Sequence, residues 1–127
     1  MEHIGIPATD PVALKNWYER VLGARTIWDS GETPPAYLVA FAGGGWLEIY
    51  AAKEKQAAPD NNSLQGFRHL ALRVKSIAEA KAELLQRGVV FTKEPGPAAG
   101  GGTVQYFEDL EGNLLHFVER SVEPTLS

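Results

Sequence analysis

The 127-residue chain contains no cysteine. Disulfide frameworks, thiolate nucleophiles and cysteine-ligated zinc or iron–sulfur sites are therefore excluded, and any bound metal must be held by nitrogen and oxygen atoms. An excess of positive charge is also lacking, because the formal net charge is -4 and the twelve Lys and Arg residues are scattered along the chain. Nucleic acid is therefore not an expected partner.

Long apolar runs are missing as well. No segment approaches 18 consecutive apolar residues, and the N-terminus has no basic region followed by an apolar stretch and a small-residue cleavage site. We therefore expect a cytoplasmic protein with no membrane partner. The hydrophobic fraction of 44% and the charged fraction of 22% are typical of a folded globular protein, and the length fits a single domain.

Two similar halves are predicted from the apolar periodicity. Each half reads as a strand, a helix and three further strands, and "HIGI" and "HLAL" open the two halves. The first helix should start at Thr9 or Asp10 and end at Gly23, and the second should start at Ser76 and end at Gly88. The predicted strands are residues 3–8, 24–29, 36–42, 46–52, 67–74, 89–94, 103–109 and 113–120.

These patterns predict one α+β domain built from two βαβββ units related by pseudo-twofold symmetry. The first unit spans residues 1–52 and the second spans residues 67–120. Between them, the polar segment 53–66 has no sustained period and is predicted to be a linker, and residues 121–127 form a tail.

One face of the strands that open and close the two units carries every histidine of the chain. His3, His69 and His116 share this face with Glu48, whereas the opposite faces are apolar and suit packing against the helices. An isolated carboxylate among small apolar residues is costly unless a positive charge compensates it. Imidazole nitrogens and a carboxylate suit one divalent ion such as Zn, Ni, Co, Mn or Fe. The small residues Gly5 and Ala71 would leave space for a bound molecule.

Each of these residues also has a purely structural interpretation. A single strand histidine is more often a packing residue than a ligand, so the metal site rests on the four residues together. Trp46 and Tyr50 lie on the Glu48 face and could bind substrate or form a plain wall. Arg73 is a candidate anchor for a substrate carboxylate or phosphate, or an exposed strand-end residue. Glu119 falls on the apolar side at a strand end and is interpreted as solvated.

With these residues in place, the chain resembles the vicinal oxygen chelate superfamily, which includes glyoxalase I, extradiol dioxygenases and metal-free bleomycin-binding proteins. The resemblance runs through "HIGIPATD", "WYERVLGA", "LEIY", "HLALRV" and "FEDLEGNLLHF", and glyoxalase I, the lactoylglutathione lyase family, is the most similar locally. It implies a cupped mixed sheet, a homodimer and one divalent metal ion. The four ligand positions of the family fall on His3, Glu48, His69 and His116.

Two departures from the glyoxalase I pattern affect the expected metal ligands and the expected substrate. The fourth ligand position is a glutamate in that family and His116 here, so a divalent ion would keep a formal charge of +1 and favour an anionic chelating substrate. Glu48 is then the expected proton acceptor, with His116 as a second catalytic group. Where the resemblance implies an Arg and an Asn that hold glutathione, this chain has Pro7 and Ala52, so a glutathione hemithioacetal is not expected as substrate.

Three functions remain open at this point. The first is a metal-dependent lyase or isomerase that chelates a small substrate through two vicinal oxygens and stabilises an enediolate or other oxyanion. The second is an extradiol-type dioxygenase, which requires ferrous iron with open positions. The third is a metal-free binding protein that holds an aromatic or cationic molecule between Trp46, Tyr50 and their neighbours.

Overall fold

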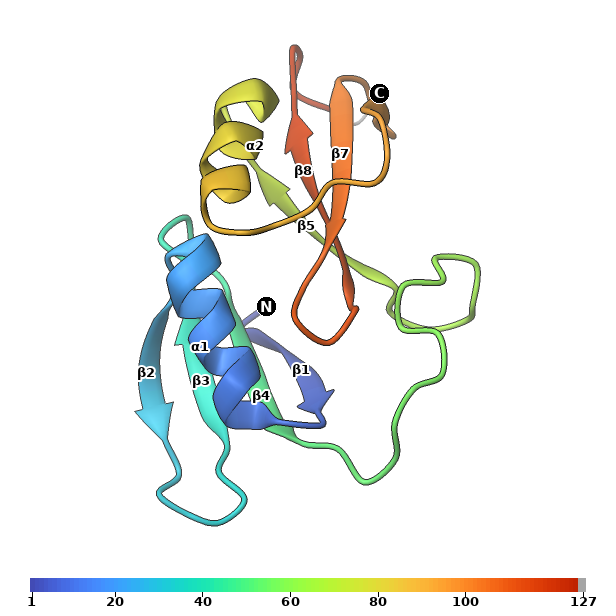
Figure 1. Ribbon diagram of the computed structural model, residues 1–127. Helices are drawn as coiled ribbons and strands as arrows, with labels where there is room; N and C mark the ends of the chain where they lie inside the picture. The colour runs from blue at the N-terminus through green and yellow to red at the C-terminus, as the bar shows by residue number, and fades with distance from the viewer. Residues whose placement is uncertain (126–127) are drawn as a thin grey trace. The chain divides into compact units, whose positions relative to one another are not determined.

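The computed structural model describes residues 1–125 and contains two compact units (Figure 1). The first comprises Met1–Ala58 together with Asp109–Glu111, and the second comprises Pro59–Glu108 and the chain from Gly112 onward. Both have the order strand, helix and three strands. The α+β class and the repeated βαβββ topology predicted from the sequence are therefore confirmed.

The first unit consists of one helix and a four-stranded mixed sheet. Its elements are β1 (His3–Ala8), α1 (Pro11–Leu22), β2 (Arg25–Asp29), β3 (Tyr37–Ala40) and β4 (Trp46–Ala51). The strand order is β1-β4-β3-β2, with β1 parallel to β4 and the other neighbours antiparallel. Figure 1 shows α1 lying along one face of this sheet.

The alternation of buried and exposed residues along the strands determines which face of the sheet α1 covers. Val39, Leu47 and Ile49 are buried, and they point to the same side as the apolar stripe of α1, from which Leu14 and Val21 are fully buried. The helix also carries the chain from β1 to β2 at the opposite edge of the sheet, which leaves room for β4 to pair in parallel with β1. One face of the sheet is thus packed, and the other is left for side chains that do not belong to the core.

The second unit repeats this arrangement with a shorter edge strand. Its elements are β5 (His69–Arg73), α2 (Ile77–Gln86), β6 (Gly96–Pro97), β7 (Thr103–Glu108) and β8 (Leu114–Glu119). The strand order β5-β8-β7-β6 matches that of the first unit, and β5 is parallel to β8. No helix within residues 1–125 has the length and apolar character needed to cross a membrane.

The strand predicted over residues 89–94 is wrong. Only Gly96 and Pro97 pair with β7. The backbone N–H of Val89 donates to the Leu84 carbonyl at the end of α2, 3.0 Å away, and the carbonyl of Lys93 accepts from a side chain rather than from a strand. The apolar residues at 89–91 have the pattern of a strand. Their segment does not pair as one, because the end of α2 and the Gln105 side chain form hydrogen bonds with backbone groups that strand pairing would need.

Both helices begin at the predicted caps. The Asp10 carboxylate accepts from the Ala13 N–H at 3.0 Å, and the Ser76 hydroxyl accepts from the Glu79 N–H at 3.2 Å. The interpretation of Glu119 as a solvated strand end is wrong, because its carboxylate accepts from the Ile77 N–H at 2.7 Å. A negative charge at the start of a helix is favourable, so Glu119 has a structural role at α2.

A carboxylate from a distant part of the chain also serves α1. The two carboxylate oxygens of Glu111 accept from the Thr9 and Asp10 N–H groups at 2.7 and 2.8 Å. Close by in sequence, the buried Asp109 carboxylate accepts from the hydroxyl of Tyr18 at 2.7 Å, and Tyr18 is itself fully buried. The turn Asp109–Glu111 therefore stabilises both the start and the middle of α1.

Replacing Tyr18 with Phe should test this contact. The variant keeps the ring but leaves the buried Asp109 carboxylate with one donor fewer, so the free energy of unfolding should fall by about 1.5–3 kcal/mol. Urea unfolding followed by tryptophan fluorescence measures the change. Tyr50→Phe, which alters an exposed tyrosine, is the matched control and should leave stability almost unchanged.

The same variant should alter stability at high pH. Burial raises the pKa of Tyr18 well above its ordinary value, and the neighbouring Asp109 charge adds to the rise. The native state therefore keeps the phenolic proton when the unfolded chain releases it near pH 10, so this stabilisation is lost as the pH rises above about 10. Tyr18→Phe should flatten that loss, and equal slopes for both proteins between pH 9 and 11 would contradict the assignment.

Candidate functional site

The face of each sheet that its helix does not cover carries the candidate residues. In β1, His3, Gly5 and Pro7 are exposed while the intervening isoleucines are partly buried. In β5, His69, Ala71 and Arg73 alternate in the same way. The strand phases predicted from the sequence are therefore correct for both opening strands.

Strand register places the candidate ligands at equivalent positions in the two units. Gly5 lies opposite Glu48 on the neighbouring parallel strand, and Ala71 lies opposite His116. Each opening histidine precedes that small residue by two positions and so lies on the same face. The pair of His3 and Glu48 in the first sheet thus matches the pair of His69 and His116 in the second.

Hydrogen bonding favours the same tautomer in the neutral form of all three imidazoles. In each ring, Nδ1 lies within hydrogen-bond distance of an oxygen atom that can only accept, so a neutral ring would carry its proton on Nδ1 and leave the lone pair on Nε2. The acceptors are the Glu2 carboxylate for His3 at 2.8 Å, the Asn62 amide oxygen for His69 at 2.8 Å and the Phe117 carbonyl for His116 at 3.2 Å. A hydrogen bond of this kind behind Nε2 is the usual arrangement of a metal-binding histidine.

The environment of His116 favours its neutral form. Burial is the main cause that lowers the pKa of this imidazole, the Phe117 carbonyl opposes the shift, and the nearby His69 and Arg120 charges add to it. The ring centroids of His69 and His116 are 4.8 Å apart. Two neutral imidazoles this close can offer two nitrogen donors to one ion, whereas two protonated ones would repel each other.

Tyr106 is a site residue that the sequence analysis missed. It lies opposite His116 on β7, and its ring makes edge-to-face contacts with His116 at 5.0 Å and His69 at 6.2 Å between centroids. The alternation of residues 103–108 places it on this face, on a strand that neither opens nor closes its unit. Tyr106 restricts the orientation of both candidate ligands.

The first sheet presents aromatic side chains beside Glu48. A Cβ atom built on Gly5 would lie 3.2 Å from Cε1 of Tyr50, so the Tyr50 ring covers Gly5. The expectation that Gly5 leaves space for a bound molecule is therefore wrong. Trp28 pairs with Leu38, which pairs with Glu48, so this tryptophan lies on the same face and is 48% exposed. The sequence pattern missed Trp28 because the bulge between Thr26 and Trp28 changes the phase of β2.

The remaining predicted substrate residues are Trp46 and Arg73. Trp46 is half-buried and lies opposite His3, on the Glu48 face of the first sheet. Arg73 is on the His69 face of the second sheet, but its guanidinium already pairs with the Glu123 carboxylate at 2.6 Å. An exposed ion pair of this kind is weak, and it occupies the cation that was predicted to anchor a substrate anion.

The types of donor atom fit a divalent metal, although the candidate ligands do not form a complete metal-binding cluster. Within residues 1–125, no group of three or more His, Asp or Glu side chains is close enough to hold an ion. The four candidates instead form one pair in each unit. Three neutral imidazole nitrogens and one carboxylate oxygen are ligands that zinc, nickel, manganese and iron accept. Neither pair by itself supplies the three protein ligands of a typical catalytic site.

Comparison with known proteins places the chain in a family. A lactoylglutathione lyase from Escherichia coli O157:H7 is 33% identical over 108 residues, which are 82% of this chain and 80% of that protein. Among solved structures, a glyoxalase family protein from Enterococcus faecalis has a TM-score of 0.79 and 25% identity, and the match covers 94% of this chain and 96% of that one.

A second solved structure shows the same fold at lower identity. A mutant of the fosfomycin resistance protein FosX from Listeria monocytogenes, complexed with Mn(II) and 1S,2S-dihydroxypropylphosphonic acid, has a TM-score of 0.71 and 21% identity. That match covers 98% of this chain and 92% of the FosX chain. The family model for the Glyoxalase/Bleomycin resistance protein/Dioxygenase superfamily matches residues 1–117. The chain therefore belongs to this superfamily.

Proposed function

We propose that this protein is a divalent-metal-dependent enzyme of the glyoxalase I type that acts on a small substrate with two vicinal oxygens. His3, Glu48, His69 and His116 would hold the metal. The two pairs must come together for this, either within one chain or between two copies in a homodimer. Family membership and the 33% identity to a lactoylglutathione lyase support an enzyme of this class.

The observation that carries the proposal is the common hydrogen bonding of the three histidines. In all three, Nδ1 faces an acceptor oxygen, which in the neutral ring leaves Nε2 for a ligand. The equivalent register of the two pairs supports the same conclusion.

The residues of the chain then have separable roles. When bound, a divalent ion supplies Lewis-acid stabilisation of an oxyanion on the substrate. Glu48 is the group that accepts a proton from the carbon next to the carbonyl, and neutral His116 is the second group that can carry a proton. Trp28, Trp46 and Tyr50 would contact the apolar part of the substrate and exclude water from it.

The proposed substrate is not a glutathione adduct. Pro7 is exposed on the site face, and Ala52 follows β4 with its N–H bonded to the Ala8 carbonyl at 2.8 Å. Neither side chain can donate a hydrogen bond to a peptide carboxylate or amide. A substrate smaller than the hemithioacetal agrees with the loss of both groups.

A metal-free binding protein is the second candidate. It is supported by the exposed aromatic rings of Trp28 and Tyr50 on one sheet face, which could stack on a planar ligand. Elemental analysis of the purified protein separates the two functions, because a binding protein of this kind would contain no stoichiometric metal. Oxygen consumption with catechols in the presence of ferrous iron would instead indicate a dioxygenase.

Metal binding should depend on all four proposed ligands. Protein equilibrated with Ni²⁺ should retain about one ion per site, and replacing His3, His69 or His116 with Ala, or Glu48 with Gln, should weaken affinity by roughly 100-fold or more. Glu108→Gln is the matched control, because this carboxylate lies on the site face of β7 but is not a proposed ligand. Unchanged affinity in the His3 and His116 variants would refute the ligand set.

Asn62 should tune metal affinity without being a ligand. Asn62→Ala removes the acceptor that holds the His69 tautomer, so metal affinity should fall by about 10- to 100-fold while the free energy of unfolding changes little. Asn61→Ala is the control, since Asn61 lies in the same loop and its side-chain oxygen accepts from the Ser63 N–H rather than from His69. Equal losses in both variants would mean that loop disruption, rather than orientation of His69, is responsible.

Proton abstraction is tested by isotope exchange. Small hydroxyketones and 2-oxoaldehydes incubated in D₂O with the metal-loaded protein should incorporate deuterium at the carbon next to the carbonyl, as followed by NMR. Glu48→Gln should reduce the exchange rate by about 100-fold or more, and Glu108→Gln should retain it. Exchange that is independent of Glu48, or of added metal, would contradict the proposed chemistry.

A further inference from the structure

Lys93 lies over the aromatic ring that contacts the second ligand pair. Its ammonium nitrogen is 5.5 Å from the centroid of the Tyr106 ring, and that ring contacts both His69 and His116. The ammonium group and the two imidazoles therefore share one aromatic neighbour. A cation over the face of a tyrosine ring is held there by the ring quadrupole.

The backbone of Lys93 is held in place by a buried side chain. The amide nitrogen of Gln105 donates to the Lys93 carbonyl at 2.8 Å, and Gln105 is completely buried. Gln105 and Tyr106 are consecutive residues of β7 and point to opposite faces of the sheet. Two neighbouring residues of one strand thus fix the main chain of Lys93 and the direction of its side chain.

Two other cations of the second unit are already engaged. Arg73 pairs with Glu123 at 2.6 Å, and the guanidinium of Arg120 donates to the Ala99 and Gly101 carbonyls of the glycine-rich loop. In the part of the chain that the structure describes, Lys93 takes part in no ion pair. Its charge is therefore available to a ligand at no cost of breaking an existing pair.

We propose that Lys93, held over Tyr106, is the anchor for a carboxylate or phosphate group of the substrate. This inference rests on the proposed function, since the chelating end of the same substrate would lie at the His69 and His116 pair. It replaces Arg73 as the anion anchor and identifies the substrate class as a vicinal-oxygen compound that carries a separate anionic group. A ligand set of three histidines and one glutamate, which leaves a net positive site, favours the same class.

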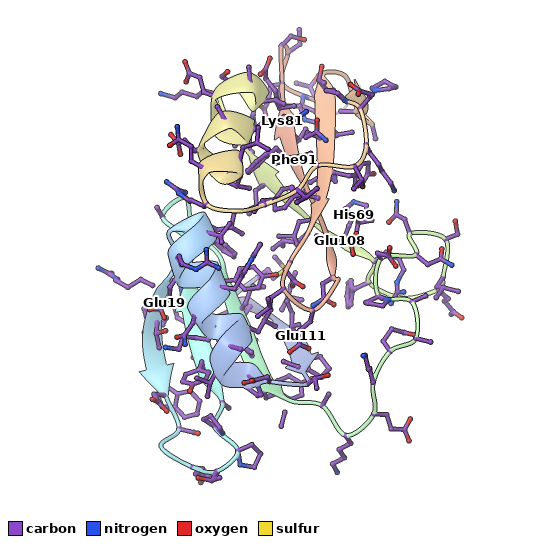
Figure 2. The ribbon with its side chains drawn as sticks, in the orientation of Figure 1. Glu19, His69, Lys81, Phe91, Glu108 and Glu111 are labelled. Carbon is purple, nitrogen blue, oxygen red and sulfur yellow. The ribbon has the colours of Figure 1, made fainter. Side chains whose placement is uncertain are left out.

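The chain contains a matched control for this contact. On α2, the ammonium of Lys81 lies 5.3 Å from the centroid of the Phe91 ring, and Figure 2 shows both side chains beside the helix. This pair resembles the Lys93 contact in its distance, but the Phe91 ring packs on Phe107, which is not a candidate ligand. Lys81→Met therefore removes an equivalent cation–π contact away from the histidine pair.

The test compares three hydroxamates, which chelate metal ions through two vicinal oxygens. Acetohydroxamate has a neutral tail, succinic monohydroxamate has a carboxylate tail, and 3-phosphonopropionohydroxamate has a phosphonate tail. Calorimetric titration of the full chain loaded with Ni²⁺ should give about three- to fivefold tighter binding for at least one anionic tail over the neutral one. This preference should weaken as NaCl is added.

The variants decide the outcome. Lys93→Met keeps the apolar stem and should abolish the preference, Lys93→Arg should keep it, and Lys81→Met should leave it unchanged, all with wild-type affinity for Ni²⁺. A preference that survives in Lys93→Met, or no preference in the wild type, overturns the anchor alone. Failure of all three hydroxamates to bind the metal-loaded protein overturns the proposed function, and the anchor with it.

Discussion

Parallel pairing of the first and last strands in each unit is the constraint from which the site follows. The pairing requires a long connection between these two strands, and the connection contains a helix that covers one face of the sheet. The other face is then free to present polar side chains. Because Gly5 and Ala71 hold equivalent registers, each sheet presents two donor groups in the same diagonal arrangement, although the sequences of the two units differ.

Electrostatics distinguish the two pairs. The first contains a carboxylate, and the second contains two imidazoles, of which His116 is kept neutral mainly by burial. Tyr106 and the peptide carbonyl of Phe117 restrain the second pair, whereas Tyr50 covers Gly5 beside the first. The carboxylate donor and the pair of imidazoles therefore belong to different units and have different neighbours.

Local patterns in the sequence were sufficient to predict where the helices begin and end and which residues of the long strands share a face. Asp10 and Gly23 mark the ends of α1 because capping depends on a few neighbouring residues. Features that depend on non-local contacts could not be predicted. The bulge that turns Trp28 onto the site face breaks the alternation, and the segment 89–94 loses its strand because Gln105 takes the Lys93 carbonyl.

The site was predictable to the same extent. Strand phase alone brings His3, His69 and His116 onto exposed or site-facing positions with Glu48. Their hydrogen-bond acceptors were not predictable, because Asn62 lies in a loop without periodicity and reaches His69 through the fold of that loop. The pairing of Arg73 with Glu123 could not be predicted either, because Glu123 lies in an irregular segment after the last strand. A charged residue on the correct face can therefore be occupied by a partner that the strand pattern does not reveal.

The turn Asp109–Glu111 has a consequence for the order in which the protein can form on the ribosome. The first unit is synthesised by residue 58, but the carboxylates that complete α1 are translated only after β7. Until then the N–H groups at the start of α1 and the hydroxyl of Tyr18 lack their acceptors. The contacts that complete the amino-terminal half therefore become available only when most of the chain has been translated.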